Sequence, residues 1–302
     1  MKYVETMNLA RFERGIPLST YTTFRIGGPA FALIKARSTD EVIEAAWKAE
    51  GQGLPWQVIG HGSNLLVSDD GFDGAVIVFR DETPPRIHDD GTVTVSGGFS
   101  LRSFVDFMAA NGLGGLENLA GIPGTVGGAI YGNAGAYGVS ISEKLISTVL
   151  LDRTGGMRRV DPDKLMFSYR SSALKSSGEV VLEARFSADS ADPAALNKTI
   201  TERLSDRQRK HPDPSLVPTA GSYFKNPSSH EGGRIPAGRL IEDAGCGQMH
   251  VGGAHLWHSH ANIIVTDGSA RARDVKELAA EMASRVEDRF GMKLTPEVVY
   301  LE

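Results

Sequence analysis

Cysteine is nearly absent from this sequence, because Cys246 is the only one in 302 residues. A single cysteine excludes an intrachain disulfide and is typical of proteins in a reducing compartment. Residues 1–17 also lack the unbroken apolar core of a secretory signal. We therefore expect a cytoplasmic protein.

The chain also lacks a marked excess of either charge, since 32 Lys and Arg stand against 37 Asp and Glu, a net charge of −5. This balance leaves no overall basic footprint for nucleic acid, so an anionic ligand must be held locally. One local candidate is a set of basic residues around a proline-rich turn: Arg203, Arg207, Arg209, Lys210 and Lys225. A solvated helix face is the alternative interpretation of this set. We expect no nucleic-acid partner.

Residues 118–142 contain no charge, but Pro123, Asn133 and many glycines make a poor lipid-facing helix. We therefore expect no membrane span. Ten glycines lie between residues 112 and 138, which is too many for a helix. Glycine has no Cβ to block positive φ or to hold a ligand away from main-chain N–H groups. We expect backbone shaped around a large, flat or phosphorylated ligand; a glycine-rich hairpin array in an ordinary fold is the alternative.

The length suggests two domains or three small ones. Apolar periodicity predicts a series of strands, at residues 31–36, 56–60, 74–79, 91–97, 147–152, 157–161 and 180–188, within 254–268, and near the C-terminus in 294–302. Capping and spacing signals predict helices at residues 40–51, 100–112, 190–210 and 269–291. The proline-rich segment 210–218 is a candidate domain boundary.

A second glycine-containing loop directly follows the strand predicted at residues 56–60. It consists of Gly60, His61, Gly62, Ser63 and Asn64. Main-chain N–H groups of such a loop can converge on a diphosphate, and the Ser and Asn side chains add donors. The loop matches neither the P-loop nor the dinucleotide fingerprint. With residues 118–142, it suggests a long cofactor that lies between two lobes, with its diphosphate on both loops.

Eight motifs in order cover nearly the whole chain: TTFRIGG (22–28), GHGSNLLV (60–67), NLAGIPGTVGGAIYGNAGAYG (118–138), YRSS (169–172), AGSYFKNP (220–227), GRLIEDAG (238–245), HAN (260–262) and PEV (296–298). Together they resemble the UDP-N-acetylenolpyruvoylglucosamine reductases. The short connection from Tyr169 to Ala220 is similar to that of the shorter subtype, which lacks the extra substrate-capping loop.

The resemblance implies an α+β fold: a two-lobed FAD-binding domain of the vanillyl-alcohol-oxidase/PCMH flavoprotein type, followed by an α+β substrate domain. The implied divisions are residues 1–80, 81–200 and 205–302. It further implies FAD, NADPH as hydride donor and a UDP-sugar precursor of peptidoglycan as substrate. We expect noncovalent FAD; a covalent link through His61, which some related flavoproteins form through a histidine in this region, is the alternative.

The resemblance also implies which residues bind the ligands. The cofactor would contact Gly60, His61, Gly62, Ser63, Asn64, Leu65, Gly121, Ile122, Pro123, Gly124, Thr125, Gly127, Gly128 and Ala129. The substrate would contact Tyr137, Lys225 and Asn226. Tyr137 could instead line the flavin site or belong to the core. Arg239 and Glu242 could contact substrate or only orient the site.

Reduction of an enolpyruvyl ether places negative charge next to a carboxylate, so the site needs a cation, hydrogen-bond donors and a proton donor. Arg170, Ser222 and Glu297 match the family's positions for these roles. Arg170 would clamp the substrate carboxylate bidentately. Ser222, polarised by neighbours, would protonate the carbon. Glu297, protonated or sharing a proton, would stabilise the enolate. Taken singly, the three could be a surface ion pair, a turn residue and a charge beside an edge strand.

Other conspicuous side chains have simpler interpretations. We expect Tyr223, Phe224 and Cys246 to pack in the core. The histidines at 255, 258 and 260 resemble a metal tract but lack nearby acidic or cysteine partners, so strand and turn positions are favoured. Two rival functions remain: a flavin oxidase or dehydrogenase of an alcohol or sugar, which air would reoxidise quickly, and a nonenzymatic sugar-nucleotide-binding protein, which would purify without a flavin spectrum.

Overall fold

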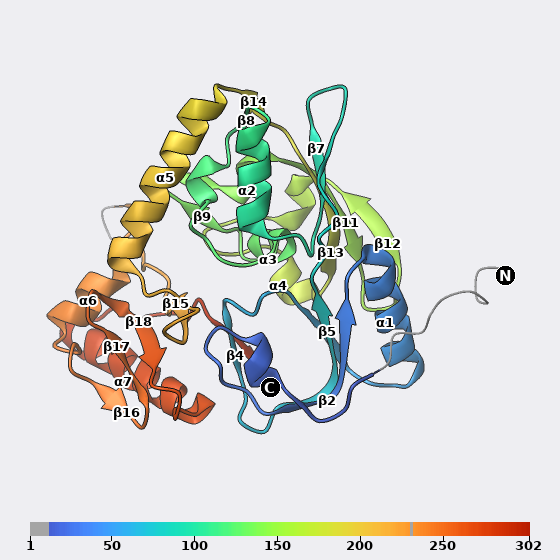
Figure 1. Cartoon of the computed structure of the whole chain (residues 1–302). Coiled ribbons are helices and arrows are strands. Elements are labelled where there is room, and N and C mark those ends of the chain that lie inside the picture. The colour runs from blue at the N-terminus through green and yellow to red at the C-terminus, as the bar shows by residue number, and fades with distance from the viewer. Residues whose placement is uncertain (1–11, 230–231) are drawn as a thin grey trace. The chain divides into compact units, whose positions relative to one another are not determined.

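The computed structural model describes residues 12–229 and 232–302, which fold into two compact units (Figure 1). Unit 1 consists of the described residues up to Ile16, of Ala30–Gly60 and of Asp73–Asn197. Unit 2 consists of Pro17–Pro29, His61–Phe72 and Lys198–Glu302. Two early segments of the chain therefore fold with its C-terminal third. The division at residues 80/81 and 200/205 stays a prediction.

One sheet of unit 1 has the strand order β1-β2-β5-β3. Its strands are β1 (Ile16–Pro17), β2 (Pro29–Ala36), β3 (Trp56–Ile59) and β5 (Phe72–Phe79). Helix α1 (Thr39–Gly51) begins after Ser38, whose side chain accepts a hydrogen bond from the Glu41 N–H, as an N-cap should. Its apolar face packs with Ile34 and Ile77 in one core cluster. This cluster joins the helix to the sheet.

The second sheet of unit 1 has the order β12-β11-β13-β7-β6 and is antiparallel throughout. Its strands are β6 (Arg86–Ile87), β7 (Val93–Ser96), β11 (Leu145–Leu151), β12 (Met157–Val160) and β13 (Val180–Phe186). Helix α2 (Leu101–Ala110) packs on this region through Phe104, whose ring lies 5.2 Å from that of Phe186. Gly112, at φ +70°, follows the helix as predicted.

The glycine-rich stretch contains a helix, α3 (Val126–Tyr131), so the prediction that it is too rich in glycine for helix is wrong at these six residues. The Thr125 hydroxyl accepts a hydrogen bond from the Gly128 N–H and caps the helix. Val126 and Ile130 are fully buried. Tertiary burial and the cap therefore offset the low helix propensity of Gly127 and Gly128.

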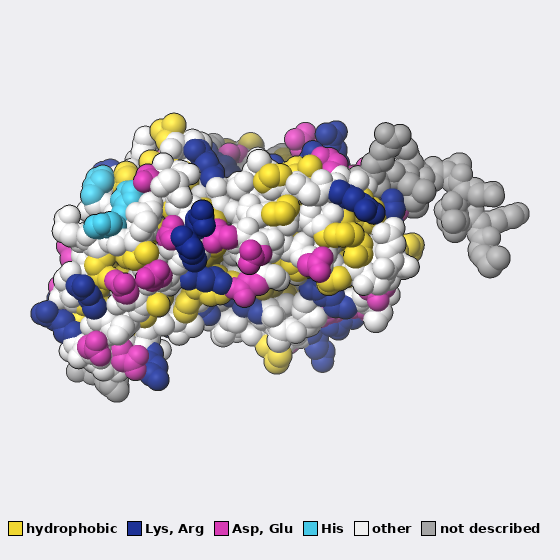
Figure 2. All heavy atoms as spheres, turned by 90° about the horizontal axis from the view of Figure 1, so that it is seen from below, with side chains coloured by type: hydrophobic (Ala, Val, Ile, Leu, Met, Phe, Trp, Pro, Cys, Tyr) yellow, Lys and Arg dark blue, Asp and Glu magenta, His cyan; other side chains and the backbone are white. Residues whose placement is uncertain are grey.

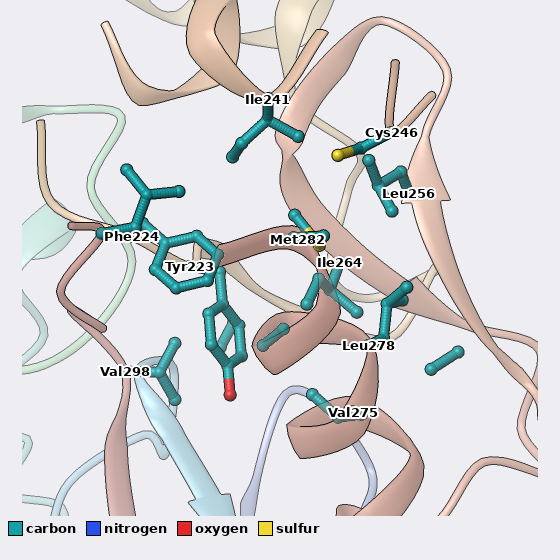
Figure 3. Close-up of a cluster of buried hydrophobic side chains, with 14 of the residues drawn as sticks. Tyr223, Phe224, Ile241, Cys246, Leu256, Ile264, Val275, Leu278, Met282 and Val298 are labelled. Carbon is teal, nitrogen blue, oxygen red and sulfur yellow. The ribbon is translucent and has the colours of Figure 1, made fainter. Parts of the chain in front are cut away.

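The sheet of unit 2 is antiparallel, with the order β15-β18-β17-β16. Its elements are β15 (Thr219–Ser222), β16 (His250–Val251), β17 (Ala254–Trp257) and β18 (His260–Thr266), with helices α6 (Ala237–Asp243) and α7 (Ala272–Phe290). The segment 254–268 thus holds two strands. In the core, Tyr223 and Phe224 lie near Val298 and among side chains of α7 such as Met282 (Figure 3).

The last strand, β19 (Val299–Leu301), pairs in parallel with β4 (Leu65–Val67), from Val299↔Leu65 to Leu301↔Val67. Both strands belong to unit 2. The sequence left this partner open, and the pairing puts the chain's end beside the segment that follows Gly60–Asn64.

The remaining elements are short, apart from α5. They are β8 (Leu113–Gly114), β9 (Gly135–Ala136), β10 (Val139–Ser140), β14 (Asp189–Ser190), α4 (Leu174–Ser177), α5 (Pro193–Lys210) and the 3-10 turns η1 (Leu18–Tyr21), η2 (Glu117–Leu119), η3 (Ile141–Lys144) and η4 (Pro162–Leu165). The predicted strands and the four predicted helices are confirmed to within a few residues.

Charges of both signs are interspersed on the face shown in Figure 2. In the predicted basic segment, Arg209 and Lys210 both pair with the carboxylate of Asp206, at 3.0 and 2.9 Å. The solvated helix face therefore accounts for these two charges. Within residues 12–229 and 232–302, no helix is both long and apolar enough to cross a bilayer.

Candidate functional site

The two glycine-containing loops predicted to hold a diphosphate meet within unit 1. Gly60 begins the first loop, and a Cβ built on it would come within 2.5 Å of the Thr125 Oγ1 in the second. Thr125 itself is fixed, because its hydroxyl caps α3. On its other side the second loop is held by the Gly127 N–H, which donates to the Gly97 carbonyl at 2.8 Å. The sequence separated these loops by some fifty residues, and the fold brings them into contact.

The rest of the first loop is fastened in unit 2 to residues 21–23. Gly62 has φ +65°, and a Cβ there would lie 1.9 Å from the Tyr21 carbonyl oxygen. The Thr23 N–H donates to the Gly62 carbonyl at 3.2 Å, while the Thr23 carbonyl accepts from the Thr219 N–H at 3.1 Å. Only glycine fits at position 62, and the TTFRIGG motif thereby links this loop to β15.

The donor chemistry of these loops suits the diphosphate of FAD. At Gly60 and Gly62 neighbouring atoms fill the place of a side chain, so the backbone runs close to its surroundings. Ser63 and Asn64 follow directly with short polar side chains, which can donate to phosphate oxygens.

Asn64 also connects this loop to the C-terminal segment. Its Nδ2 donates to the Glu297 carbonyl at 3.1 Å. Its own carbonyl accepts from the Val299 N–H at 3.0 Å. A residue predicted to bind cofactor and a residue predicted to be catalytic are therefore neighbours within unit 2.

Ser222 and Glu297 come from two segments that lie side by side. The Glu297 N–H donates to the Tyr223 carbonyl at 2.7 Å, and the Lys225 N–H donates to the Thr295 carbonyl at 2.9 Å. Antiparallel pairing of Phe224 with Pro296 lies between these two bonds. We call residues 222–225 and 295–297 the paired segments. Their pairing brings the segment of the predicted proton donor next to the segment of the predicted carboxyl group.

Asn226, predicted to bind substrate, has a structural bond in unit 2. Its Oδ1 accepts from the Ala237 N–H at 2.9 Å. This N–H opens α6, whose N-cap residue is Pro236 and therefore supplies no capping oxygen. The Asn226 carbonyl also accepts from Arg234 Nη1 at 3.1 Å. The Asn226 side chain thus caps α6, whatever else it does.

Arg170, in unit 1, adopts a left-handed backbone conformation with φ +54°. Its Nη2 donates to the Gly135 carbonyl at 2.5 Å. The Lys175 ammonium donates to the Arg170 carbonyl at 2.9 Å, and the Ser172 hydroxyl donates to the Tyr131 carbonyl at 2.8 Å. The YRSS motif is therefore tied at several points to the glycine-rich stretch.

Two further left-handed residues belong to the same part of unit 1. Asn133 has φ +44° and Tyr137 has φ +51°. The Asn133 Nδ2 donates to the Ser168 carbonyl at 3.0 Å. Each such non-glycine conformation costs about 1 kcal/mol or more, and a cluster of them is typical of a functional site. Tyr137 is 46% exposed, which leaves its side chain accessible, as a role in binding requires.

The predictions of packing roles are confirmed. Tyr223, Phe224 and Cys246 are at most 3% exposed and belong to one core cluster of unit 2. Burial raises the pKa of the Cys246 thiol, which makes it less reactive. The Tyr223 hydroxyl bonds to that of Tyr300 at 2.9 Å, and burial raises the pKa of Tyr223 far above its ordinary value.

The histidines lie where predicted: His255 in β17, His258 in the following turn and His260 in β18. The ring of His260 lies 5.3 Å from that of His211. Burial, followed by the charge of Arg207, lowers the pKa of His211 to about 3. Burial also lowers the pKa of His260. Both imidazoles are therefore neutral at physiological pH.

Arg239, one of the two residues whose role the sequence left open, pairs with Asp243 at 3.6 Å on the surface of α6. The sequence motifs assign no individual role to Asn262, the last residue of the HAN motif. Asn262 is 2% exposed and bonds to Tyr223 and Phe224. A polar residue at the third position of a strand, directly before an apolar run, was the signal that could have found it.

Comparisons with known proteins cover both units. Residues 213–301 match the family model described as UDP-N-acetylenolpyruvoylglucosamine reductase, C-terminal domain, and residues 30–161 match that of an FAD binding domain. UDP-N-acetylenolpyruvoylglucosamine reductase 2 of Symbiobacterium thermophilum is 39% identical over 95% of this chain and 91% of its own length. The reductase of Bacillus licheniformis is 36% identical over 93% and 91%.

A solved structure agrees with these sequence matches. The crystal structure of UDP-N-acetylenolpyruvylglucosamine reductase from Thermus caldophilus superposes with a TM-score of 0.79 at 32% identity. The match covers 97% of this chain and 100% of that one. The similarity therefore extends over both units.

Proposed function

Because the chain belongs to the UDP-N-acetylenolpyruvoylglucosamine reductase family, we propose that it reduces UDP-N-acetylglucosamine enolpyruvate to UDP-N-acetylmuramate. This reaction belongs to the synthesis of peptidoglycan precursors. Hydride from NADPH would reach the enolpyruvyl group by way of bound FAD, which is the chemistry that this cofactor supplies. A cytoplasmic enzyme of this kind is compatible with a single, buried cysteine.

The observation that carries the proposal is the pairing of the segments that hold Ser222 and Glu297, because it brings a hydroxyl donor and a carboxyl group into one part of unit 2. Ser222 would deliver the proton to the substrate carbon. A hydroxyl is a weak acid, so the transfer requires polarisation by neighbouring groups. Glu297 would supply a further hydrogen bond to the enolate as its charge develops.

Arg170 would bind the substrate carboxylate. A guanidinium group has five N–H donors in a planar fork, and the bond to the Gly135 carbonyl uses one of them. A bidentate clamp on a carboxylate uses two parallel N–H groups and gives direction as well as charge.

The FAD diphosphate would be held by the loop 60–65 and by residues 121–129. Ser63 and Asn64 support this assignment through their side-chain donors. At Gly60 and Gly62 neighbouring protein atoms leave no room for a Cβ. Tyr137 and Lys225 would contact the sugar nucleotide. Asn226 could do so only through the hydrogen-bonding capacity that its bond to the Ala237 N–H leaves available.

Replacement of Ser222 by Ala tests the proposal. NADPH should still bleach the flavin at the normal rate, whereas reoxidation by the enolpyruvyl substrate should slow about 100- to 10,000-fold, the range for loss of a positioned acid. Ser269→Ala is the matched control, because it removes a hydroxyl elsewhere in unit 2, where Ser269 bonds to Asp267. Equal loss in both half-reactions would contradict the assigned role, and so would normal reoxidation.

A further inference from the structure

Asn262 is a buried polar residue in β18 of unit 2, only 2% exposed. Its backbone carbonyl accepts from the Tyr223 N–H at 2.7 Å. Its side chain makes two more bonds to one residue: Oδ1 accepts from the Phe224 N–H at 2.9 Å, and Nδ2 donates to the Phe224 carbonyl at 2.8 Å. Every polar atom of this amide group is thus directed to the segment just after Ser222.

These bonds act where the ordinary ladder between β15 and β18 is irregular. The register shifts between Thr219 and Ser222, and Gly221 lies between them at φ +76°. Ser222 is the last residue of β15 and pairs with Ile263. Beyond it, the Asn262 side chain presents one acceptor and one donor to Phe224, as a peptide group of a neighbouring strand would. The amide therefore extends the ladder past the bulge.

The opposite edge of the same segment pairs with residues 295–297. Tyr223 and Lys225 make the bonds to Glu297 and Thr295 described above. Residues 223–225 therefore lie between Asn262 on one side and the Glu297 segment on the other. A change at Asn262 would therefore act on the backbone that directly follows Ser222.

We propose that Asn262 is a positioning residue for the reductive step: its side-chain amide sets the backbone from Ser222 to Phe224 and so aims the Ser222 hydroxyl. Asn262 does not touch the reacting atoms and acts through its neighbours. The inference rests on the proposed function, in which Ser222 donates the proton.

Asn262→Asp separates positioning from a general role in folding, because its effect depends on pH. A protonated carboxyl group has one acceptor oxygen and one O–H donor, so it can make both bonds to Phe224. An ionised carboxylate accepts from the Phe224 N–H but faces the Phe224 carbonyl with a second acceptor. Burial favours the protonated form, so the transition should fall within the range in which the enzyme can be assayed.

The experiment follows both half-reactions of the FAD-loaded full chain from pH 5 to pH 9. For Asn262→Asp, we expect reoxidation by the enolpyruvyl substrate to be close to normal at the acid end and to fall about 10- to 100-fold relative to the unchanged protein as pH rises. Flavin reduction by NADPH should stay normal throughout. Val275→Ala is the control for general destabilisation. Val275 lies in the core cluster that contains Tyr223 and Phe224, but it makes none of the hydrogen bonds to residues 222–225 described above.

If Asn262→Asp fails to fold, Asn262→Ser takes its place, since it removes both bonds to Phe224 without burying a charge. It should slow reoxidation at every pH, with no new pH dependence. Reoxidation in either variant that matches Val275→Ala would overturn the inference.

The Ser222→Ala background distinguishes this inference from the proposed function. If Asn262 acts through Ser222, Asn262→Asp should add no further loss of reoxidation there, whereas additive losses would overturn its positioning role. Slow reoxidation in Ser222→Ala with normal reoxidation in Asn262→Asp would overturn the role of Asn262 alone. Normal reoxidation in Ser222→Ala would overturn the role of Ser222 and, with it, the positioning role.

Discussion

The glycine loops and the paired segments are built on different principles. The loops at 60–64 and 118–138 depend on the absence of side chains. At Gly60 and Gly62, for example, neighbouring atoms occupy the place that a Cβ would take. The paired segments depend on what a side chain adds, since the amide of Asn262 continues a hydrogen-bond ladder. A region of the first kind is sensitive to added volume, and one of the second kind to lost donors and acceptors.

Gly62→Ala should have the largest effect on stability. Its Cβ would lie 1.9 Å from the Tyr21 carbonyl oxygen at φ +65°, so backbone must move. We expect a loss on the order of 3 kcal/mol or more in the free energy of unfolding, together with loss of bound FAD. Denaturant unfolding and the flavin absorbance after purification measure the two effects.

Gly291→Ala is the control, because Gly291 also lies in unit 2 at φ +65° but has nothing within 4 Å of its Cβ position. It should cost only about 1 kcal/mol, the conformational price of a left-handed alanine. Equal losses in the two variants would show that conformation, and not close packing, limits the glycine loop.

Arg170→Lys tests whether the YRSS motif, which is bonded to the glycine-rich stretch, needs the donor geometry of a guanidinium group to bind substrate. A lysine keeps the charge but cannot form a bidentate clamp, so reoxidation by substrate should slow about 10- to 100-fold with flavin reduction unchanged. Arg158→Lys is the matched control, because Arg158 makes two bonds to the Glu179 carboxylate elsewhere in unit 1. Normal reoxidation in Arg170→Lys would remove Arg170 from the site.

Gly60→Ala should be milder than Gly62→Ala, because the nearest atoms belong to the Thr125 side chain and not to backbone. We expect a loss of about 1–2 kcal/mol in unfolding free energy from overpacking. Thr125→Ala removes both the obstructing atoms and the cap of α3, at about 1 kcal/mol. The double variant should lose less than the sum of the single losses. Strict additivity would contradict the contact between the two loops.

His211, whose ring lies 5.3 Å from that of His260, should affect stability alone. Its pKa is about 3 in the folded protein, below the ordinary value of 6.5, so the unfolded chain takes up a proton first as pH falls. Stability should therefore be lost as pH falls from 6.5 towards 3, on the order of 1 kcal/mol after allowance for partial exposure. His211→Gln should flatten this dependence, measured by denaturant unfolding at each pH. An unchanged slope would contradict the assignment.

Much of the fold could be predicted from local patterns, because strands such as β5 and helices such as α7 carry clear apolar periodicity. Helix α3 could not, since it depends on burial of Val126 and Ile130 and on the Thr125 cap. The motifs pointed to Ser222 and Glu297 separately, but their pairing is a contact between distant segments that no local pattern encodes. Asn262 carried a local signal, a polar residue within a strand, but its bonds to Phe224 exist only after β18 and β15 have paired.

The most direct test of the proposed reaction is an anaerobic measurement. The purified protein is reduced with NADPH, UDP-N-acetylglucosamine enolpyruvate is added, and the absorbance band of oxidised flavin is followed. We expect the band to bleach with NADPH and to return rapidly with the substrate. A flavin that bleaches, stays reduced in the presence of substrate and is reoxidised quickly by air would contradict the proposed reaction and favour an oxidase.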